Sequence, residues 1–564
     1  LATSREPLNF QAESVIALDG LPTGVLEMSA AEALFGERGR MARDDFAVTA
    51  DNLFQVRQIC ELVDGSPLGI ALAAAWVRRR SLPQIIEGIG QSLDFLSSRL
   101  RDVDPRHRSV RAVFETSWQL LTAEEVSVLA ALSVFPTTFT AVSAAQVAGA
   151  TLFDLDLLCE KSLLQQQHEL ERYEMHSLLR QFAADKLAIR TLEVDRAFVH
   201  HFYQFAHTHQ NNYAQLQPEW RNLLTAVTKA HAHQLWQQVI SFVQVLDEPW
   251  FRQIRFQDMR HGLMLALEAA KALQDQPALA RALLRLGEIE IELNDYSVAE
   301  THLGEAVQHF MRLEDSLGVA QSEYLYGRIK SEQGQDNEAL KLFETSKQIF
   351  EEEKDWLGVA QSLNLIAVHH FKNSSNFQTA QRYLEQSAHL QRQLPITPTY
   401  VETLRYLVRI MILTEAYDAA EDYLTKASEV SLQLKDIGEY AAILFEHLLL
   451  CKFRQQFDEA LAVGYDCLEQ FKKLGSLRWE GLVNTQLGLL HQAKQEHEHG
   501  VILLLAGLHI FKELGDTFEQ AYSYFYLYKL YAEMGKTELS LEAREQAIRL
   551  NLELKNPRLA ERLE

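Results

Sequence analysis

The sequence lacks the cysteine pairs of a disulfide framework or a zinc ribbon. Its four cysteines are scattered along 564 residues, and no two form a CxxC pair. Cysteines at short, regular spacing mark secreted disulfide scaffolds and zinc sites, so a reduced, cytoplasmic compartment is indicated. No metal site is predicted either. The histidines at 200–209 and 491–499 have no cysteine or carboxylate to complete a ligand set, and we interpret them as solvated.

Basic residues are also in short supply. Lysine and arginine number 54 against 77 acidic residues, a net charge of −23. Phosphate contact needs a basic face, so broad binding of nucleic acid or of an anionic membrane is not expected. The longest apolar stretch, around residues 501–506, is far shorter than the roughly 20 residues of a membrane span. The length predicts several soluble domains rather than one core.

No Gly-x-x-x-x-Gly-Lys-Ser/Thr motif occurs anywhere in the sequence. The backbone amides and the lysine of such a loop hold nucleotide phosphates, and its hydroxyl holds magnesium. The chain as given is therefore expected to bind nucleotide poorly and to hydrolyse nothing.

The second half of the sequence contains a regular repeat. Small residues recur at steps of 40 or 41, and a second series lies seven residues before them. The first series is Ala226, Ala266, Ala306, Ser346, Ser387, Ala427, Cys467, Gly507 and Ala547. The second is Ala299, Ala339, Ala380, Ala420, Ala460, Gly500 and Ser540. A fixed period with helical patterning predicts a solenoid of paired helices.

Packing explains why these positions stay small. Two helices approach closely only where the contact residue lacks bulk, so each small residue marks a helix crossing. Turn-forming residues fall at matching places, around 293–296, 333–336, 454–457 and 533–536. The pattern over about 219–550 resembles tetratricopeptide repeats, with Gly287, Gly327 and Gly488 at that family's first-helix glycine. Because the period exceeds the usual ~34 residues, we expect longer helices.

The first half resembles the end of an NB-ARC-like ATPase module, as found in bacterial STAND-class signalling proteins. The resemblance begins with Leu1-Ala-Thr-Ser-Arg-Glu6, similar to a sensor 1 strand end, then Val15–Leu18 and the exit turn Asp19-Gly-Leu-Pro22. Residues 29–40 are similar to the first helix of the family's lid. Gly65-Ser66-Pro67-Leu68 resembles its GLPL segment.

The resemblance continues into a winged helix. Residues 104–118 and 120–125 follow the pattern of bacterial members, and Thr122 with Glu125 forms a predicted capping box. Residues 129–135 are predicted to be core helix. Residues 159–164 and 172–177 are predicted to form a small β-wing, which ends in Met175-His176-Ser177, similar to the family's MHD motif.

The resemblance implies three nucleotide contacts. Arg5 would reach the terminal phosphate, Pro67 would lie against adenine, and His176 would contact the β-phosphate of ADP and lock a closed form. Serine at 177 replaces the motif's aspartate, which implies that bound ADP holds the closed form more weakly or through different contacts. No catalytic residue is predicted in this chain. In the family the phosphate-binding loop directly precedes sensor 1, so we expect the native protein to be longer than this chain. We expect ADP or ATP with magnesium to bind only if that loop is present in the full-length protein.

The predicted fold is mostly α. It comprises the end of an NTPase domain as a short α/β remnant (1–24), a helical lid (25–105), a winged helix (106–195), a helical linker with degenerate first repeats (196–278), and a solenoid of TPR-like hairpins with a 40-residue period (279–564). The winged helix is expected to pack on the lid and on the start of the solenoid rather than stand free.

Three functions follow from these patterns. The first is the regulatory part of a nucleotide-switched protein, whose solenoid binds a protein, peptide or small-molecule inducer and which forms a homo-oligomer on activation. The second is a DNA-binding transcriptional regulator. The recognition helix expected around 140–158 carries no lysine or arginine, so no direct nucleic-acid contact is expected from it. The third is an interaction scaffold without nucleotide function.

Overall fold

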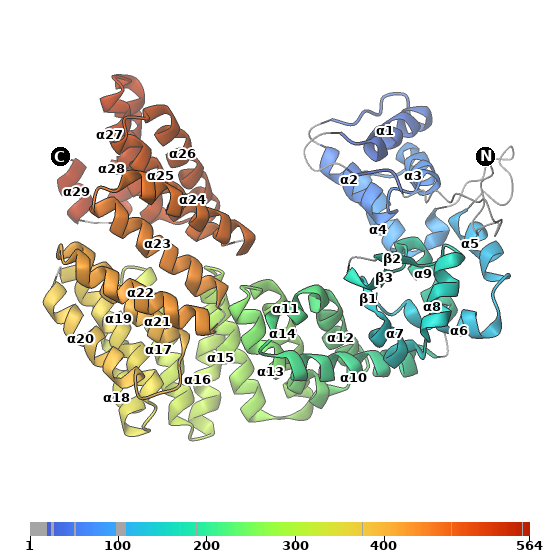
Figure 1. Ribbon diagram of the computed structural model, residues 1–564, viewed down its shortest axis with the longest axis horizontal. Helices are drawn as coiled ribbons and strands as arrows, with labels where there is room; N and C mark the ends of the chain where they lie inside the picture. The colour runs from blue at the N-terminus through green and yellow to red at the C-terminus, as the bar shows by residue number, and fades with distance from the viewer. Residues whose placement is uncertain are drawn as a thin grey trace. The chain divides into compact units, whose positions relative to one another are not determined.

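The computed structural model describes residues 20–23, 28–49, 52–96, 109–167, 170–187, 190–374, 376–434, 436–474, 476–554 and 557–563. Two compact units divide at residues 235 and 236 (Figure 1). As the sequence predicts, the chain is mostly helical, with a solenoid of helical hairpins and one small sheet. The predicted domain boundaries stay predictions, and the division at 235 falls inside the predicted 196–278 segment.

The first unit begins with a group of short helices and 3-10 turns. They are α1 (Ala30–Ala42), α2 (Leu53–Leu62), α3 (Pro67–Ala74), η1 (Ala75–Arg78), α4 (Leu82–Gln91) and η2 (Leu93–Phe95). The Glu32 carboxylate accepts the Ser29 amide at 2.7 Å, which fixes the start of the helix expected at 29–40. Ser66 accepts the Gly69 amide at 3.3 Å, and Pro67 takes the first helical position, where a missing amide proton costs nothing.

The next segment combines helices with the sheet. Its helices are α5 (Val110–Trp118), α6 (Ala123–Leu132), α7 (Ala141–Ala148), α8 (Leu152–Glu160) and α9 (Ser177–Leu187). The strands β1 (Phe139–Thr140), β2 (Gln165–Gln167) and β3 (Arg172–Glu174) pair antiparallel in the order β1-β3-β2. The predicted capping box is confirmed: Glu125 accepts the Thr122 amide at 2.7 Å and donates its own amide to the Thr122 hydroxyl at 3.2 Å.

The first strand of the predicted wing was placed too early. Residues 159 and 160 end α8, and Ser162 turns the chain with a φ of 56°. The strand therefore begins only at Gln165. The second strand lies where it was predicted, and Tyr173 pairs with both Phe139 and Gln166.

Three more helices complete the first unit: α10 (Thr191–His209), the short α11 (Tyr213–Leu216) with the turn η6 (Gln217–Glu219), and α12 (Trp220–Ala232). Arg172 on β3 forms a buried ion pair with Glu219 at 2.6 Å. Asn222 on α12 donates to the Thr138 carbonyl at 3.1 Å. These contacts join the sheet segment to the helices that follow it.

The second unit is a succession of antiparallel hairpins. The pairs are α13 (Trp236–Arg252) with α14 (Phe256–Leu273), α15 (Gln276–Glu292) with α16 (Tyr296–Arg312), α17 (Ser316–Glu332) with α18 (Asp336–Glu352), α19 (Trp356–Ser374) with α20 (Phe377–Gln391), α21 (Pro398–Leu413) with α22 (Tyr417–Leu434), α23 (Ile437–Phe453) with α24 (Phe457–Leu474), α25 (Leu477–Ala493) with α26 (His497–Glu513), and α27 (Thr517–Glu533) with α28 (Thr537–Leu554), followed by α29 (Pro557–Leu563).

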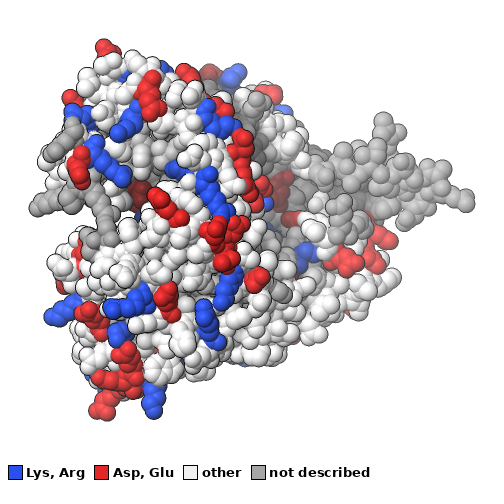
Figure 2. All heavy atoms as spheres, turned by 60° about the vertical axis from the view of Figure 1, so that its left-hand side comes forward, with Lys and Arg blue, Asp and Glu red and all other residues white. Residues whose placement is uncertain are grey.

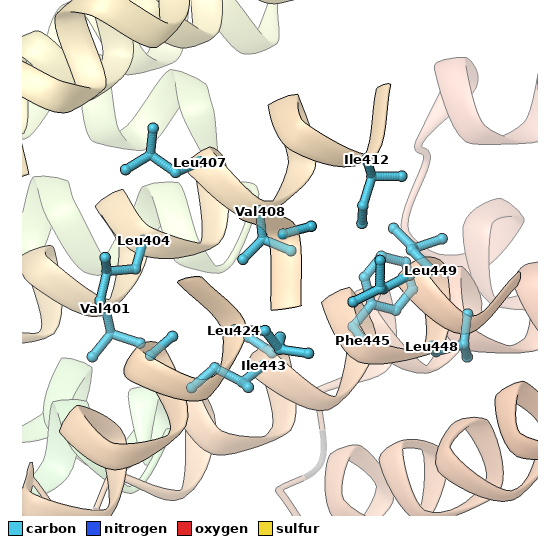
Figure 3. Close-up of a cluster of buried hydrophobic side chains, with 14 of the residues drawn as sticks. Val401, Leu404, Leu407, Val408, Ile412, Leu424, Ile443, Phe445, Leu448 and Leu449 are labelled. Carbon is cyan, nitrogen blue, oxygen red and sulfur yellow. The ribbon is translucent and has the colours of Figure 1, made fainter. Parts of the chain in front are cut away.

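The small residues lie at helix crossings, as predicted. Ala226, Ala306 and Ala427 are fully buried. A β-carbon added at Gly327 would lie 2.4 Å from the Phe343 ring, so only glycine allows this approach. Larger side chains fill the remaining space, as Figure 3 shows for Val401, Leu404, Leu407 and Val408 on α21 and their neighbours on α22 and α23. The helices are long for such repeats: α15 to α18 have 17 residues each.

In the described part of the chain, no single helix is both long and apolar enough to cross a membrane. The bent pair α7 and α8 meets that test of length and composition when the two helices are taken together.

Candidate functional site: a polar junction and a charged helix face

The structure describes two of the three residues that were predicted to contact nucleotide. Arg5 lies outside the described residues. Pro67 begins α3, and His176 immediately precedes α9. Asp64, three residues before Pro67, contacts the His176 segment, so the structure brings the two predicted motifs to one junction. The structure does not test whether either residue contacts a nucleotide.

Asp64 is the centre of this junction. Its Oδ2 accepts the Ser177 amide at 2.6 Å and lies 3.3 Å from His176 Nδ1. The Ser177 hydroxyl donates to the Leu62 carbonyl at 3.1 Å. Because Ser177 is the first residue of α9, a carboxylate from the turn after α2 caps that helix and faces the positive end of its dipole.

The His176 ring is held by two neighbours of opposite character. Nδ1 lies 3.3 Å from the Leu178 amide and 3.3 Å from Asp64 Oδ2. Burial lowers the pKa of His176, although the Asp64 carboxylate opposes that effect. The His176 side chain is 39% exposed, so part of the ring remains open to a ligand.

A close backbone contact fixes the loop before Pro67. Gly65 has a φ of +64°, and its carbonyl accepts the Leu21 amide at 2.9 Å. A β-carbon at Gly65 would lie 2.1 Å from the Leu21 carbonyl oxygen, and one at Gly20 would lie 2.0 Å from the Asp64 carbonyl oxygen. Residues 20–21 therefore pack directly on the Asp64 loop, and glycine is required on both sides of the contact.

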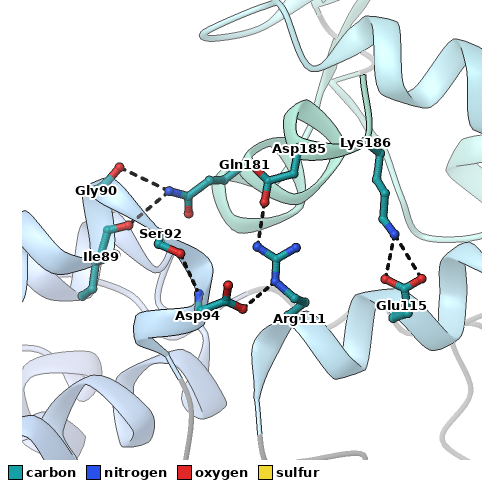
Figure 4. A network of polar contacts seen from close by, with 9 residues as sticks. All are labelled: Ile89, Gly90, Ser92, Asp94, Arg111, Glu115, Gln181, Asp185 and Lys186. Atoms are coloured by element: carbon teal, nitrogen blue, oxygen red, sulfur yellow. Dashed lines mark hydrogen bonds and ion pairs between the residues drawn. The ribbon is translucent and has the colours of Figure 1, made fainter. Parts of the chain in front are cut away.

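A second polar network lies between α4, α5 and α9 (Figure 4). Arg111 bridges Asp94 and Asp185, both at 2.6 Å, and Lys186 pairs with Glu115 at 2.9 Å. Gln181 on α9 donates to the Ile89 and Gly90 carbonyls, each at 3.2 Å. These contacts join α9 to the lid-like helices, as expected if the two segments pack together. Most of these side chains are exposed, so each pair contributes less than about 1 kcal/mol.

The segment expected to hold a DNA recognition helix presents apolar side chains instead. Val142 on α7, with Leu152 and Phe153 on α8, are each more than 60% exposed. With no lysine or arginine between residues 140 and 158, this surface has no cation to contact phosphate.

In the second unit, the first helices of successive hairpins lie closer together than the second helices. Several residues of α15 contact α17, and the same holds for α19 with α21 and for α21 with α23. Among the described residues, consecutive second helices, such as α16 and α18, do not contact each other as extensively. The first helices therefore line the inner side of the solenoid's curvature. The Arg252–Asp436 ion pair at 2.9 Å agrees with this, since it joins α13 to α23 across 184 residues.

Ion pairs connect these first helices one to the next. Arg285 pairs with Asp247 at 3.1 Å, Arg328 with Glu292 at 2.7 Å, Arg405 with Glu439 at 3.0 Å, and Arg409 with Glu446 through two bonds at 2.5 and 2.7 Å. We call these side chains the inner charge row. They are partly buried, and the facing carboxylates raise the pKa of Arg285 and Arg328 although burial alone lowers it.

The most enclosed part of the inner charge row surrounds Arg405. Its side chain is 13% exposed, its guanidinium lies 5.6 Å from the centre of the Trp479 ring, and its buried Nε has no hydrogen-bond partner. Burial raises the pKa of Glu439 to about 7, even though Arg405 opposes the shift. Nearby, the Tyr406 hydroxyl donates to Glu402 at 3.2 Å. A buried donor without an acceptor is costly, so the unpaired Nε adds to the free-energy cost of burying the Arg405–Glu439 pair.

The charged surface beyond this row is mixed in sign. On the face seen in Figure 2, basic and acidic side chains alternate without a large patch of one charge. A specific partner would therefore depend on local geometry rather than on a long-range field.

Sequence reasoning missed both Asp64 and the inner charge row. The row has a signal in the sequence, because its partners lie 34 to 38 residues apart, slightly less than one repeat. No sequence pattern points to Asp64, because its partner Ser177 is 113 residues away. One interpretation was wrong: His491 is not solvated but 8% exposed, held by Glu496 at 2.6 Å and Tyr465 at 2.9 Å.

Comparison with known proteins supports the repeat assignment. Residues 318–393 match the tetratricopeptide repeat family. Over 282 residues the chain is 28% identical to a "Putative HTH-type transcriptional regulator" of Mycobacterium tuberculosis, a match covering 47% of this chain and 31% of that protein. An uncharacterized protein of the same organism is 30% identical over 166 residues, which are 28% of this chain and 42% of that protein. The chain thus spans about a third of the length of the first of these relatives.

Two solved structures are similar to this chain in part. A signal transduction ATPase with numerous domains and a tetratricopeptide repeat sensor, from Pyrococcus horikoshii, is 15% identical with a TM-score of 0.48, over 97% of this chain and 75% of that one. A Rap protein complexed with Competence and Sporulation Factor is 12% identical with a TM-score of 0.44, over 58% of this chain and 99% of that one. At these values neither likeness identifies a ligand.

Proposed function

We propose that this chain is the sensor portion of a nucleotide-switched signalling protein of the STAND type. The repeat solenoid binds a peptide segment of a partner protein on its inner charge row. The Asp64–His176 junction holds the lid and the winged helix in the resting arrangement. The observation that carries the binding proposal is the row of arginine–carboxylate pairs on the first helices, where the guanidinium of Arg405 pairs with Glu439 and lies over the Trp479 ring.

The chemistry of this surface favours a peptide. Peptide carbonyls and side chains of either sign find partners among the partly exposed arginines and glutamates of the row. The Phe251 ring, whose centre lies 5.3 Å from the guanidinium carbon of Arg285, offers apolar contact. Binding replaces some internal ion pairs, so the affinity depends on matched charges rather than on buried area alone.

A peptide selection tests this proposal. Random peptides displayed on phage are selected on the 564-residue chain, and the affinity of the best peptide is measured by fluorescence anisotropy. The variant Arg405→Gln should weaken binding about tenfold or more, because a buried charged contact is worth about 1.5–3 kcal/mol. Arg312→Gln, on the exposed end of α16, is the control and should leave the affinity unchanged. Equal weakening by both variants, or by neither, would contradict the proposal.

The nucleotide part of the proposal rests on the junction. The partly exposed His176 ring lies next to the N-terminus of α9, and such a terminus favours a phosphate oxygen. The test uses the protein expressed from its own gene, whose extracted nucleotide is identified by chromatography. We expect bound ADP in the wild type. ADP should be lost in His176→Ala and retained in the control His207→Ala. Absence of nucleotide from the wild type would favour the interaction scaffold.

Direct DNA binding by the 140–158 segment is the less supported function. The curated relatives named as transcriptional regulators are about three times longer than the part that matches, so that name extends to this segment only as a proposal. The exposed Val142, Leu152 and Phe153 suit contact with protein better than contact with phosphate.

A further inference from the structure

Three potential metal ligands meet between the two helices of one hairpin. His447 and Cys451 lie four residues apart on one face of α23, and Glu459 lies in the first turn of α24. One ligand atom from each residue lies within 4.8 Å of the other two. Among the residues that the structure describes, no other group of three or more histidine, cysteine or carboxylate side chains comes this close.

The repeat pattern makes His447 an exception. One period before and one period after, the same helix position is held by Leu407 and Leu487, both fully buried. A half-buried imidazole at a position that both neighbouring repeats fill with leucine departs from the local packing. Such departures without a packing gain are where functional residues are found.

His447 and Glu459 are also not engaged elsewhere. Neither side chain forms a hydrogen bond or an ion pair with any other described side chain. His491, one period after Cys451, shows the contrasting arrangement, because it is bonded to both Glu496 and Tyr465. The ligand atoms at 447 and 459 are therefore available.

The donor set is that of zinc. Imidazole nitrogen, thiolate sulfur and carboxylate oxygen bind Zn²⁺ at about 2.0–2.3 Å, which places neighbouring ligand atoms roughly 3.3–3.8 Å apart in a tetrahedron. From separations of up to 4.8 Å, closure needs side-chain movements of about 1 Å. Glu459 is exposed and can swing inward without disturbing the core.

We propose that His447, Cys451 and Glu459 bind one zinc ion through three protein ligands, with a fourth position open to solvent. Glu459 also lines a shallow surface depression of about 370 Å³ together with Gln455, Gln456, Phe457, Asp458 and Lys494, which gives the ion a route of entry. The ion would tie α23 to α24 at their connecting turn, within the hairpin that contributes Glu439 and Glu446 to the inner charge row.

Binding must remove the thiol proton. Zinc binds the thiolate of a cysteine, whereas a free cysteine is mostly a neutral thiol at neutral pH. Zinc binding therefore releases one proton from Cys451, and the affinity should rise with pH.

Calorimetric titration of the chelator-treated chain with zinc chloride tests the site. We expect one ion per chain, a rise in melting temperature with zinc, and proton release that is visible as a dependence of the heat on buffer. Cobalt(II) in place of zinc should give a sulfur-to-cobalt absorption band. The affinity should fall at least about tenfold in Cys451→Ser, in Glu459→Gln and in His447→Leu.

The variants are chosen to remain folded. His447→Leu restores the residue of the neighbouring repeats, and Cys467→Ala, at a position where Ala427 stands one repeat earlier, is the matched cysteine control. Circular dichroism checks each fold. Zinc binding that Cys467→Ala preserves and His447→Leu abolishes supports the site. Absence of saturable binding to the wild type, or unchanged binding in His447→Leu and Cys451→Ser, would overturn it.

Discussion

Removing the Asp64 carboxylate should loosen the junction between α9 and the loop before Pro67. Asp64 caps the first amide of α9 at 2.6 Å, and its side chain is 39% exposed. Loss of a capping carboxylate costs about 1–2 kcal/mol. The residue also has a φ of 48°, which alanine adopts at a cost of about 1 kcal/mol more than aspartate or asparagine. Asp64→Ala should therefore lower the unfolding free energy of the first unit by about 2–3 kcal/mol.

Urea denaturation followed by tryptophan fluorescence measures this change. Asp64→Asn keeps one oxygen acceptor and the tolerance of a left-handed backbone, so it should cost about 0.5–1 kcal/mol. Asp44→Ala, at an exposed turn, is the control and should stay within about 0.5 kcal/mol of the wild type.

The same variant has a second, independent readout. Asp64 raises the pKa of His176 against the effect of burial, so Asp64→Ala should lower the pKa of His176 further, as measured by NMR titration. Unchanged stability together with an unchanged His176 pKa would refute the reasoning, because both effects arise from one carboxylate.

Two further predictions concern the solenoid. Glu439 has a pKa raised to about 7 by burial, so the folded state binds a proton that the unfolded state has released, and stability should fall as pH rises from about 4.5 to about 7. Glu439→Gln should flatten that slope in thermal melts across this range, and a slope equal to that of the wild type would contradict the assignment. Gly327→Ala should destabilise by about 1–3 kcal/mol, because the new methyl would lie 2.4 Å from the facing ring. Gly90→Ala, with nothing within 4 Å, should be neutral or mildly stabilising in the same urea assay.

Sequence periodicity was sufficient to predict the hairpins because one requirement repeats in each of them. A close helix crossing tolerates only a small side chain, so Ala306, Ser346 and Ala427 mark the crossings without reference to any other residue. Caps are similarly local, which is why the Thr122–Glu125 pair was predictable.

Contacts between distant segments were not predictable in this way. The Asp64–Ser177 bond depends on the packing of two segments 113 residues apart, and no local pattern encodes it. The first wing strand was misplaced because α8 continues to Glu160, and the turn that ends it depends on a left-handed Ser162 rather than on glycine. The proximity of His447 and Glu459 was not predictable either, because it depends on which faces of α23 and α24 pack against each other.

Hydrogen exchange with a selected peptide tests the central claim most directly. The chain is compared with and without saturating peptide, and protection is followed by mass spectrometry for each helix of the second unit. The account predicts added protection on the first helices α17, α21 and α23, around Arg328, Arg405 and Glu446, and little change on α18, α22 and α24. Protection confined to the second helices, or to the first unit, would contradict the claim that the inner charge row binds the partner.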